Sequence, residues 1–144
     1  MDIRWAAAGL TTLVMVCGCG SSQSGVSAAD LAITHDVRRG ADEIRTTHDR
    51  KTLEAQLGRV VARLRATRGS TAVVERARAA ALAGFVLTRK GVRSQIDFME
   101  NDSGEVEAAT VHARRADLYL KRGANRIRAA GAALGLRIDD LDGY

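Results

Sequence analysis

Proline is absent from this 144-residue chain, cysteine occurs twice, tryptophan occurs once, and aromatic residues make up only 3% of it. Two cysteines are too few for the disulfide framework of a small secreted domain. The absence of proline removes the strongest helix breaker, and abundant alanine and arginine favour helices. The length suits one domain rather than two of ordinary size. The composition therefore predicts a single all-α domain.

The N-terminal region has the pattern of an export signal. An uncharged, mostly apolar run over residues 5–16 follows Asp2 and Arg4. The run is shorter than the ~20 residues that cross a bilayer but falls within the ~7–15 residues of a secretory signal. An ordinary signal cleaved after Ala29 and a cytosolic chain with an apolar start are the alternatives.

The residues that follow this run are Val16, Cys17, Gly18 and Cys19. They resemble the lipobox of bacterial lipoproteins, in which an aliphatic, a variable and a small residue precede the lipidated cysteine. The resemblance covers about the first 22 residues. It implies that residues 1–18 are a signal peptide and that Cys19 carries the lipid.

Lipidation of Cys19 would leave the mature chain without a free thiol, because cleavage also removes Cys17. That outcome excludes a cysteine nucleophile, a thiolate metal site and a disulfide. Several acyl chains give stable anchoring, since each buried methylene contributes about 0.8 kcal/mol. We therefore expect a lipid-anchored protein on the extracytoplasmic face of a cell membrane.

The remaining chain divides by composition. Residues 19–27 are rich in Gly and Ser and are expected to form a flexible tether. Residues 28–138 have a helical pattern, with turn signals at 68–71 and 101–105. Residues 139–144 contain three aspartates and form an acidic C-terminal tail.

Two segments carry apolar or small residues at alternating three- and four-residue steps, which is the period of a packed helix. The middle segment has Val74, Ala77, Ala81, Gly84, Thr88, Gly91, Gln95, Ile96 and Met99. The last segment has Val106, Ala109, Ala113, Ala116, Leu120, Gly123, Ile127, Ala130 and Leu134. The many Ala and Gly residues predict closely packed helix axes.

The first segment is less regular. Leu31, Val37, Ala41 and Ile44 form one stripe, whereas Leu53, Leu57, Val60, Val61 and Leu64 form another stripe with a different phase. A wholly polar stretch, residues 46–52, separates them. We expect a small antiparallel three-helix bundle with a long, bent first helix; a four-helix bundle is the alternative. The three-helix version brings Asp139, Asp140 and Asp142 close to residues 63–68.

Catalytic and metal-binding patterns are missing. The chain has no His-Glu-x-x-His, and none of its three histidines has an acidic residue three positions earlier. It also has no nucleophile elbow or phosphate-binding Walker loop. An acidic run at residues 139–142 ends too early for an EF-hand loop. We expect no catalytic, cofactor-binding or metal site, and so no enzyme.

Basic residues concentrate in two stretches, at a formal net charge of +5. They are either solvated helix faces or contacts to an anionic partner. The candidate contacts are Arg59, Arg63, Arg65, Arg68, Arg114, Arg115, Lys121 and Arg122. Neither interleaved aromatic residues nor a recognised binding motif supports nucleic acid as the partner.

These observations predict a non-enzymatic, membrane-anchored envelope lipoprotein. Its helical domain would bind an unknown envelope protein or associate with itself. The alternative is electrostatic binding of an anionic lipid or envelope polymer through the basic helix faces.

Overall fold

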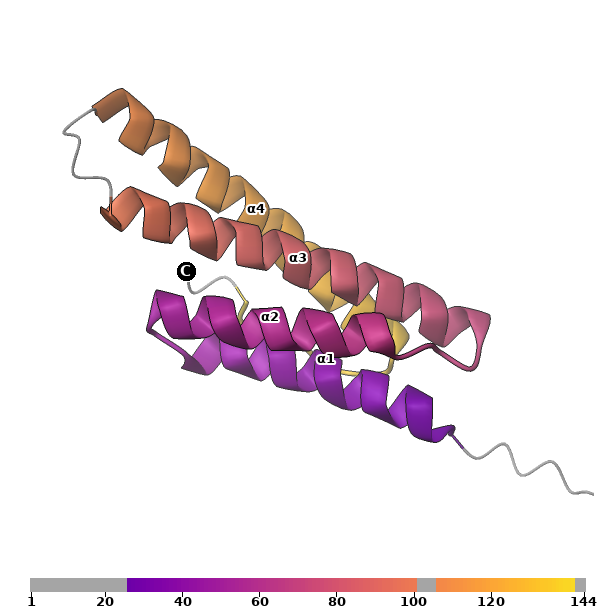
Figure 1. The fold of residues 1–144 in the computed structure, drawn as a ribbon. Helices are drawn as coiled ribbons and strands as arrows, with labels where there is room; N and C mark the ends of the chain where they lie inside the picture. The colour runs from indigo at the N-terminus through magenta and orange to yellow at the C-terminus, as the bar shows by residue number, and fades with distance from the viewer. Residues whose placement is uncertain (1–25, 101–105, 142–144) are drawn as a thin grey trace, which may run out of the picture.

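The computed structural model describes residues 26–100 and 106–141. This part of the chain consists of four helices joined without any strand (Figure 1). The helices are α1 (Ala28–Thr46), α2 (Arg50–Ala66), α3 (Ala72–Glu100) and α4 (Val106–Ala133). The predicted all-α fold is confirmed. The three-helix bundle with a bent first helix is wrong, and the four-helix alternative fits.

The polar stretch between the two stripes of the first segment is where α1 ends and α2 begins. Asp49 caps α2: its carboxylate accepts a hydrogen bond from the backbone N–H of Thr52 at 2.7 Å. Hydrogen bonding with Thr52 lowers the pKa of Asp49 below its usual value. Thr47 donates from Oγ1 to Gln56 at 2.8 Å, which joins the turn to α2. Capping therefore ends one helix and begins another.

The helices α1 and α2 lie antiparallel. Asp36 of α1 accepts from Nε of Arg63 at 2.6 Å, and Asp30 accepts from the backbone N–H of Ser70 at 2.8 Å, just after α2. The two apolar stripes thus face each other, although Leu31 is exposed and Ile33 is buried in its place. The α1–α2 part of the core contains Ile33, Val37, Ala41, Ile44, Leu53, Leu57, Val60, Val61 and Leu64.

The helices α3 and α4 pack closely over their glycines. A Cβ atom built on Gly84 would lie 3.0 Å from the backbone oxygen of Gly123, and one on Gly91 would lie 3.1 Å from that of Ala116. Such distances leave no room for a side chain. The seam that the sequence predicts is buried from Ala77 to Gly91 in α3.

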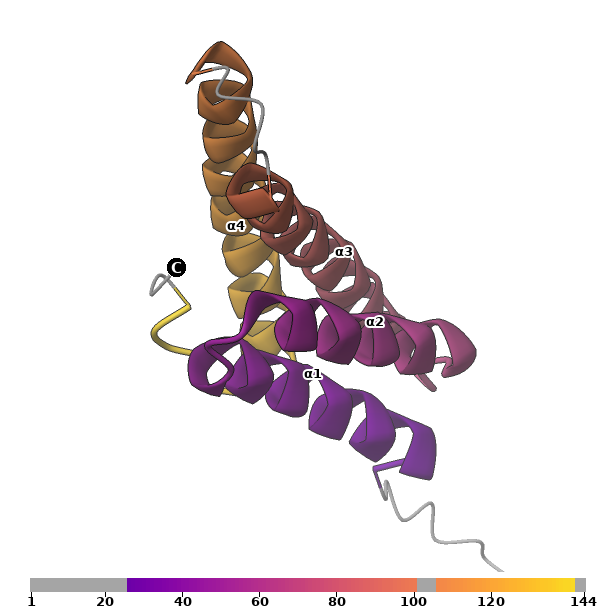
Figure 2. The same cartoon turned by 60° about the vertical axis from the view of Figure 1, so that its left-hand side comes forward.

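The hairpin of α3 and α4 is longer than the α1–α2 pair. At 1.5 Å per residue, its helices of 29 and 28 residues span ~42–44 Å, against ~26–29 Å for those of 19 and 17 residues. The hairpin end, comprising residues 93–100 and 106–115, extends beyond α1 and α2 in both views (Figures 1 and 2). There the predicted seam lacks cover: Met99 is 62% exposed and Val106 is 79% exposed.

The chain turns back after α4. Gly135, at φ 70°, allows the N–H of Leu136 to bond the carbonyl of Gly131 at 2.8 Å. Asp139 then lines a surface hollow with Arg38 and Arg45 of α1.

The predicted contact between the acidic tail and residues 63–68 is therefore wrong for the described tail. The extra helix reverses the direction of the chain, so the end of α2 runs from the middle of α1, where Arg63 bonds Asp36, towards its start, where Ser70 bonds Asp30. Asp139 instead lies beside the C-terminal half of α1. Asp142 lies outside the described residues.

Candidate functional site

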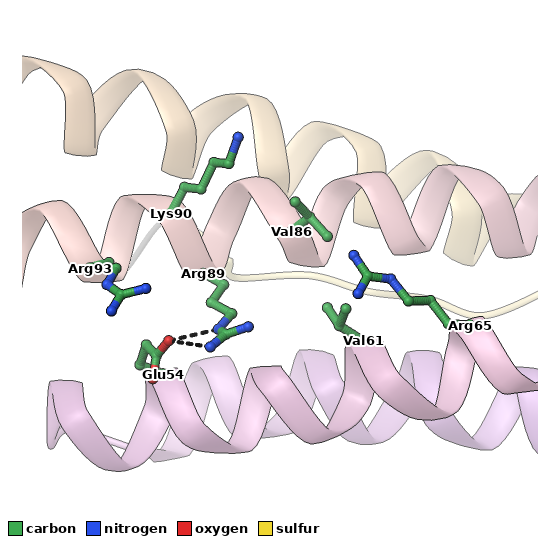
Figure 3. A pocket seen from close by; sticks show the side chains of 7 residues that line it. All are labelled: Glu54, Val61, Arg65, Val86, Arg89, Lys90 and Arg93. Atoms are coloured by element: carbon green, nitrogen blue, oxygen red, sulfur yellow. Dashed lines mark hydrogen bonds and ion pairs between the residues drawn. The ribbon is translucent and has the colours of Figure 1, made fainter.

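A groove of about 200 Å³ runs between α2 and α3. Apolar side chains from both helices form part of its lining, and basic side chains surround them (Figure 3). Its lining residues are Glu54, Val61, Arg65, Val86, Arg89, Lys90 and Arg93.

Glu54 and Arg89 form the fixed part of this groove. Nε of Arg89 donates to Oε1 of Glu54 at 2.7 Å, and Nη2 lies 2.6 Å from the same oxygen in an ion pair. The Glu54 side chain is 22% exposed and that of Arg89 is 42% exposed. Gly58, one turn after Glu54, leaves space for the guanidinium, which lies 3.5 Å from the position of a Cβ there. The pair therefore joins α2 to α3 and orients Arg89.

The other cations of the groove have no such partner. Among the described residues, Arg65, Lys90 and Arg93 form no hydrogen bond or ion pair. Figure 3 shows Arg65 reaching from α2 towards α3, while Arg93 reaches from α3 towards α2 and Lys90 points away from α2. Four cations thus surround one carboxylate, and the groove has a positive field that attracts anions.

Of the basic residues predicted on the first segment, only Arg65 lines the groove. Arg63 bonds Asp36 of α1, Arg68 pairs with Glu75 at 3.3 Å, and Arg59 is exposed elsewhere on α2. The structure therefore separates residues that are close in sequence, because successive positions on a helix point in different directions.

The predicted residues of the last segment do not reach the groove either. Arg114, Arg115 and Arg122 are exposed on α4, and Lys121 pairs with Asp117 at 3.0 Å.

Sequence reasoning missed the cations that α3 contributes, namely Arg89, Lys90 and Arg93. Their spacing of three and four residues places Arg89 and Lys90 one turn from Arg93, which was an available signal. The acids Asp97 and Glu100 follow them in the same segment. Glu100, however, pairs with Lys51 at 2.6 Å and lies outside the groove.

A second polar cluster joins the end of α2 to the start of α3. Glu75 accepts from Nε of Arg78 and from the backbone N–H of Gly69, both at 2.9 Å. The Arg78 hydrogen bond, followed by that from Gly69, lowers the pKa of Glu75 to about 2. The buried Arg78 also donates from Nη1 to the carbonyl of Leu64 at 2.6 Å, which satisfies the C-terminal end of α2. This cluster is structural, because its charges pair with each other.

The hairpin end carries a hollow of about 230 Å³ between α3 and α4. Phe98 and Leu120 contribute apolar walls and Asp117 contributes a carboxylate. Within the described residues, the Oε1 atom of Gln95 is buried in this region without a hydrogen-bond partner. The hollow is therefore mainly apolar, with the Asp117 carboxylate as its charged group.

Metal sites and membrane-spanning helices were also sought in the described ranges. No group of three His, Cys, Asp or Glu side chains there is arranged to hold a metal ion. No helix of 26–100 or 106–141 has the length and hydropathy to span a membrane. Cys19 and the predicted signal peptide lie outside the described residues. Comparison with protein-family models, curated proteins and solved structures found no match.

Proposed function

We propose that the chain is a non-enzymatic envelope lipoprotein, anchored through Cys19, whose helical domain binds another protein surface with the hairpin end of α3 and α4. One observation carries this proposal: four large apolar side chains are exposed at the hairpin end, and a fifth, Leu118, is exposed just after it on α4. The four are Phe98, Met99, Val106 and Val111.

The position of this end suits an anchored protein. The chain enters the bundle at Ala28, beside the α2–α3 connection, because Asp30 bonds Ser70. The hairpin end lies at the opposite end of α3 (Figures 1 and 2). A lipid attached before α1 would therefore leave the apolar end facing away from the membrane. The occupant is either a second copy of the chain or a helical segment of another envelope protein.

Site-specific photo-cross-linking of the full chain in its membrane tests this proposal. A photoreactive residue replaces Phe98, and in a matched control it replaces Val73, which is 52% exposed near the other end of α3. We expect a cross-linked product from position 98 and none from position 73. A product of twice the chain mass would identify a second copy. Equal cross-linking at both positions, or none at either, would contradict the proposal.

The anchor has a separate test. Changing Cys19 to Ser should abolish lipid attachment, raise the apparent mass by retention of residues 1–18, and alter membrane fractionation. Cys17→Ser is the control and should be processed as the wild type. Unchanged processing of Cys19→Ser would show that Cys19 is not the lipidated residue.

Electrostatic binding of an anionic lipid or envelope polymer is the second candidate function. The unpartnered cations of the α2–α3 groove favour it, since Arg65 lies one residue before the end of α2 and so close to where the chain enters the bundle.

A further inference from the structure

We propose that the groove between α2 and α3 is a binding site for the phosphate group of an anionic phospholipid. The inference goes beyond hairpin binding, because the groove shares no lining residue with the hollow at the hairpin end. It also makes the second candidate function more specific, because it assigns anion binding to one groove instead of to whole basic helix faces.

Charge is the first argument. Arg65 reaches across from α2, and Arg89 and Arg93 reach back from α3, so three guanidinium groups border one space (Figure 3). A guanidinium offers a planar fork of N–H donors that matches a phosphate. Arg65 and Arg93 have no partner within the described chain. A phosphate bound at Arg89, which lies between the Arg93 and Arg65 ends of the groove, would accept charge-assisted hydrogen bonds from its guanidinium and relieve the repulsion among the three cations (Figure 3).

Glu54 is the second argument, because it orients Arg89 without using all its donors. Both contacts are to a single carboxylate oxygen, and a guanidinium has five N–H groups. Arg89 therefore keeps donors for a ligand and loses less side-chain entropy on binding it. Glu54 is also a rival anion. Glu54→Gln keeps an acceptor oxygen for Arg89 but removes the negative charge, so it should strengthen binding.

The apolar lining selects a lipid over a free phosphate. Val61 of α2 is buried, and Val86 of α3 is half-buried beside it. Inorganic phosphate gains nothing from contact with these methyl groups. The glycerol and first methylenes of a lipid would cover the accessible part of Val86 and gain hydrophobic free energy.

An anchor at Cys19 would also hold the groove close to the membrane surface, where lipid headgroups lie. Eight residues separate Cys19 from Ala28 and span at most ~28 Å when extended. The chain enters the bundle next to the α2–α3 connection, close to the Arg65 end of the groove. This argument alone rests on the proposed function; the charge and the lining do not.

The test titrates the full chain, purified in a neutral detergent, with phosphatidylglycerol, phosphatidylcholine or inorganic phosphate, and follows binding by native mass spectrometry. We expect phosphatidylglycerol to bind most tightly. The double variant Arg65→Gln with Arg93→Gln should weaken it roughly 20- to 30-fold, at about five-fold per charge. Glu54→Gln should bind it several-fold more tightly. The matched control, Arg114→Gln with Arg115→Gln, removes the same charge from α4 and should leave the affinity unchanged.

Each contrary result overturns a definite part of the inference. An equal loss in the α4 double variant would show diffuse attraction to the net charge and no defined site. Inorganic phosphate binding as tightly as the lipid would show that the apolar lining plays no part. Unchanged affinity in the groove double variant would remove the site altogether, yet would leave hairpin cross-linking unaffected. Thermal unfolding by circular dichroism verifies that the variants fold.

Discussion

At the residue scale, the distance between helices is set by glycines that cannot accept a methyl group. A Cβ on Gly40 would lie 2.5 Å from the ring of Phe85, and one on Gly123 would lie 2.9 Å from the backbone oxygen of Gly84. Phe85 is the largest fully buried side chain, and its ring occupies the place where a side chain on α1 would stand. The core therefore needs few aromatic side chains, because glycines let the helices approach closely and leave little space between them to fill.

Two glycine substitutions should have opposite effects on stability. Gly123→Ala forces a methyl group against backbone atoms that cannot move freely and should reduce the free energy of unfolding by about 1–3 kcal/mol. Gly58→Ala meets only the Arg89 side chain, at 3.5 Å, and should raise the free energy of unfolding by about 0.5–1 kcal/mol through helix propensity. Urea unfolding followed by circular dichroism measures both. Destabilisation of the same size at both positions would contradict this explanation.

The sequence identifies these glycines as helical but does not rank them. Gly58 and Gly123 both occupy helix interiors. They differ only in what lies opposite: a flexible guanidinium in one case and a backbone carbonyl in the other. That difference arises from helices distant in sequence, so no local pattern reports it.

At the element scale, polar residues decide where helices begin and end. The stretch 46–52 contains the cap Asp49 that starts α2, and the bonds of Glu75 and Arg78 close the connection between α2 and α3. The sequence located the second connection correctly at residues 68–71, whereas it predicted a bend within one long helix at residues 46–52. It did not show that the first was a full reversal, because a polar stretch also occurs where a long helix bends. A bent helix and two antiparallel helices differ in whether the two apolar stripes face each other, and this is a tertiary contact.

The α2–α3 connection should make stability depend on acidic pH. The pKa of Glu75 is about 2 in the fold, against an ordinary value of 4.5, mainly because of Arg78. A lowered folded-state pKa gives stability that is complete above the unfolded-state pKa and is lost as the pH falls towards the folded-state value. The free energy of unfolding should therefore decrease between about pH 4.5 and 2.

Glu75→Gln should flatten this decrease, and urea unfolding at several pH values measures it. Part of the decrease should remain, since hydrogen bonds from Ser70 also lower the pKa of Asp30. The matched control is Glu107→Gln, an exposed residue that forms no ion pair within the described ranges, and it should keep the wild-type profile. A wild-type profile in the Glu75 variant would show that this carboxylate does not couple folding to pH.

At the scale of the whole molecule, the unequal lengths of the two helix pairs leave the hairpin end of α3 and α4 with less cover than the rest. In α4, Ala116, Gly123, Ile127 and Ala130 are buried, whereas Val106 and Ala113, which continue the same seam, are exposed. Helices that pack on fewer neighbours open locally at a lower free energy than the rest of the fold. The hairpin end should therefore be the least stable part of the bundle.

Amide hydrogen exchange should show this difference within single helices. We expect residues 107–114 to exchange roughly 10- to 100-fold faster than residues 123–130 of the same helix, and residues 93–99 faster than residues 77–88. Mass spectrometry of peptides after timed labelling measures the rates. Binding of a partner at the hairpin end should slow exchange there alone. Uniform rates along α3 and α4 would show that the hairpin end is as stable as the covered half.

The sequence by itself determined the all-α class, the small-residue interface of α3 and α4, and the turn at residues 68–71 between α2 and α3. These properties are local: periodicity, propensity and capping act over a few neighbouring residues. Only the tertiary structure decided that residues 26–100 and 106–141 form four helices, that Arg65 lines the same groove as Arg89 and Arg93, and that Asp139 lies beside α1 instead of residues 63–68. The reversal between α1 and α2 determines which helix ends lie next to each other. The charged side chains that line the α2–α3 groove depend on that arrangement.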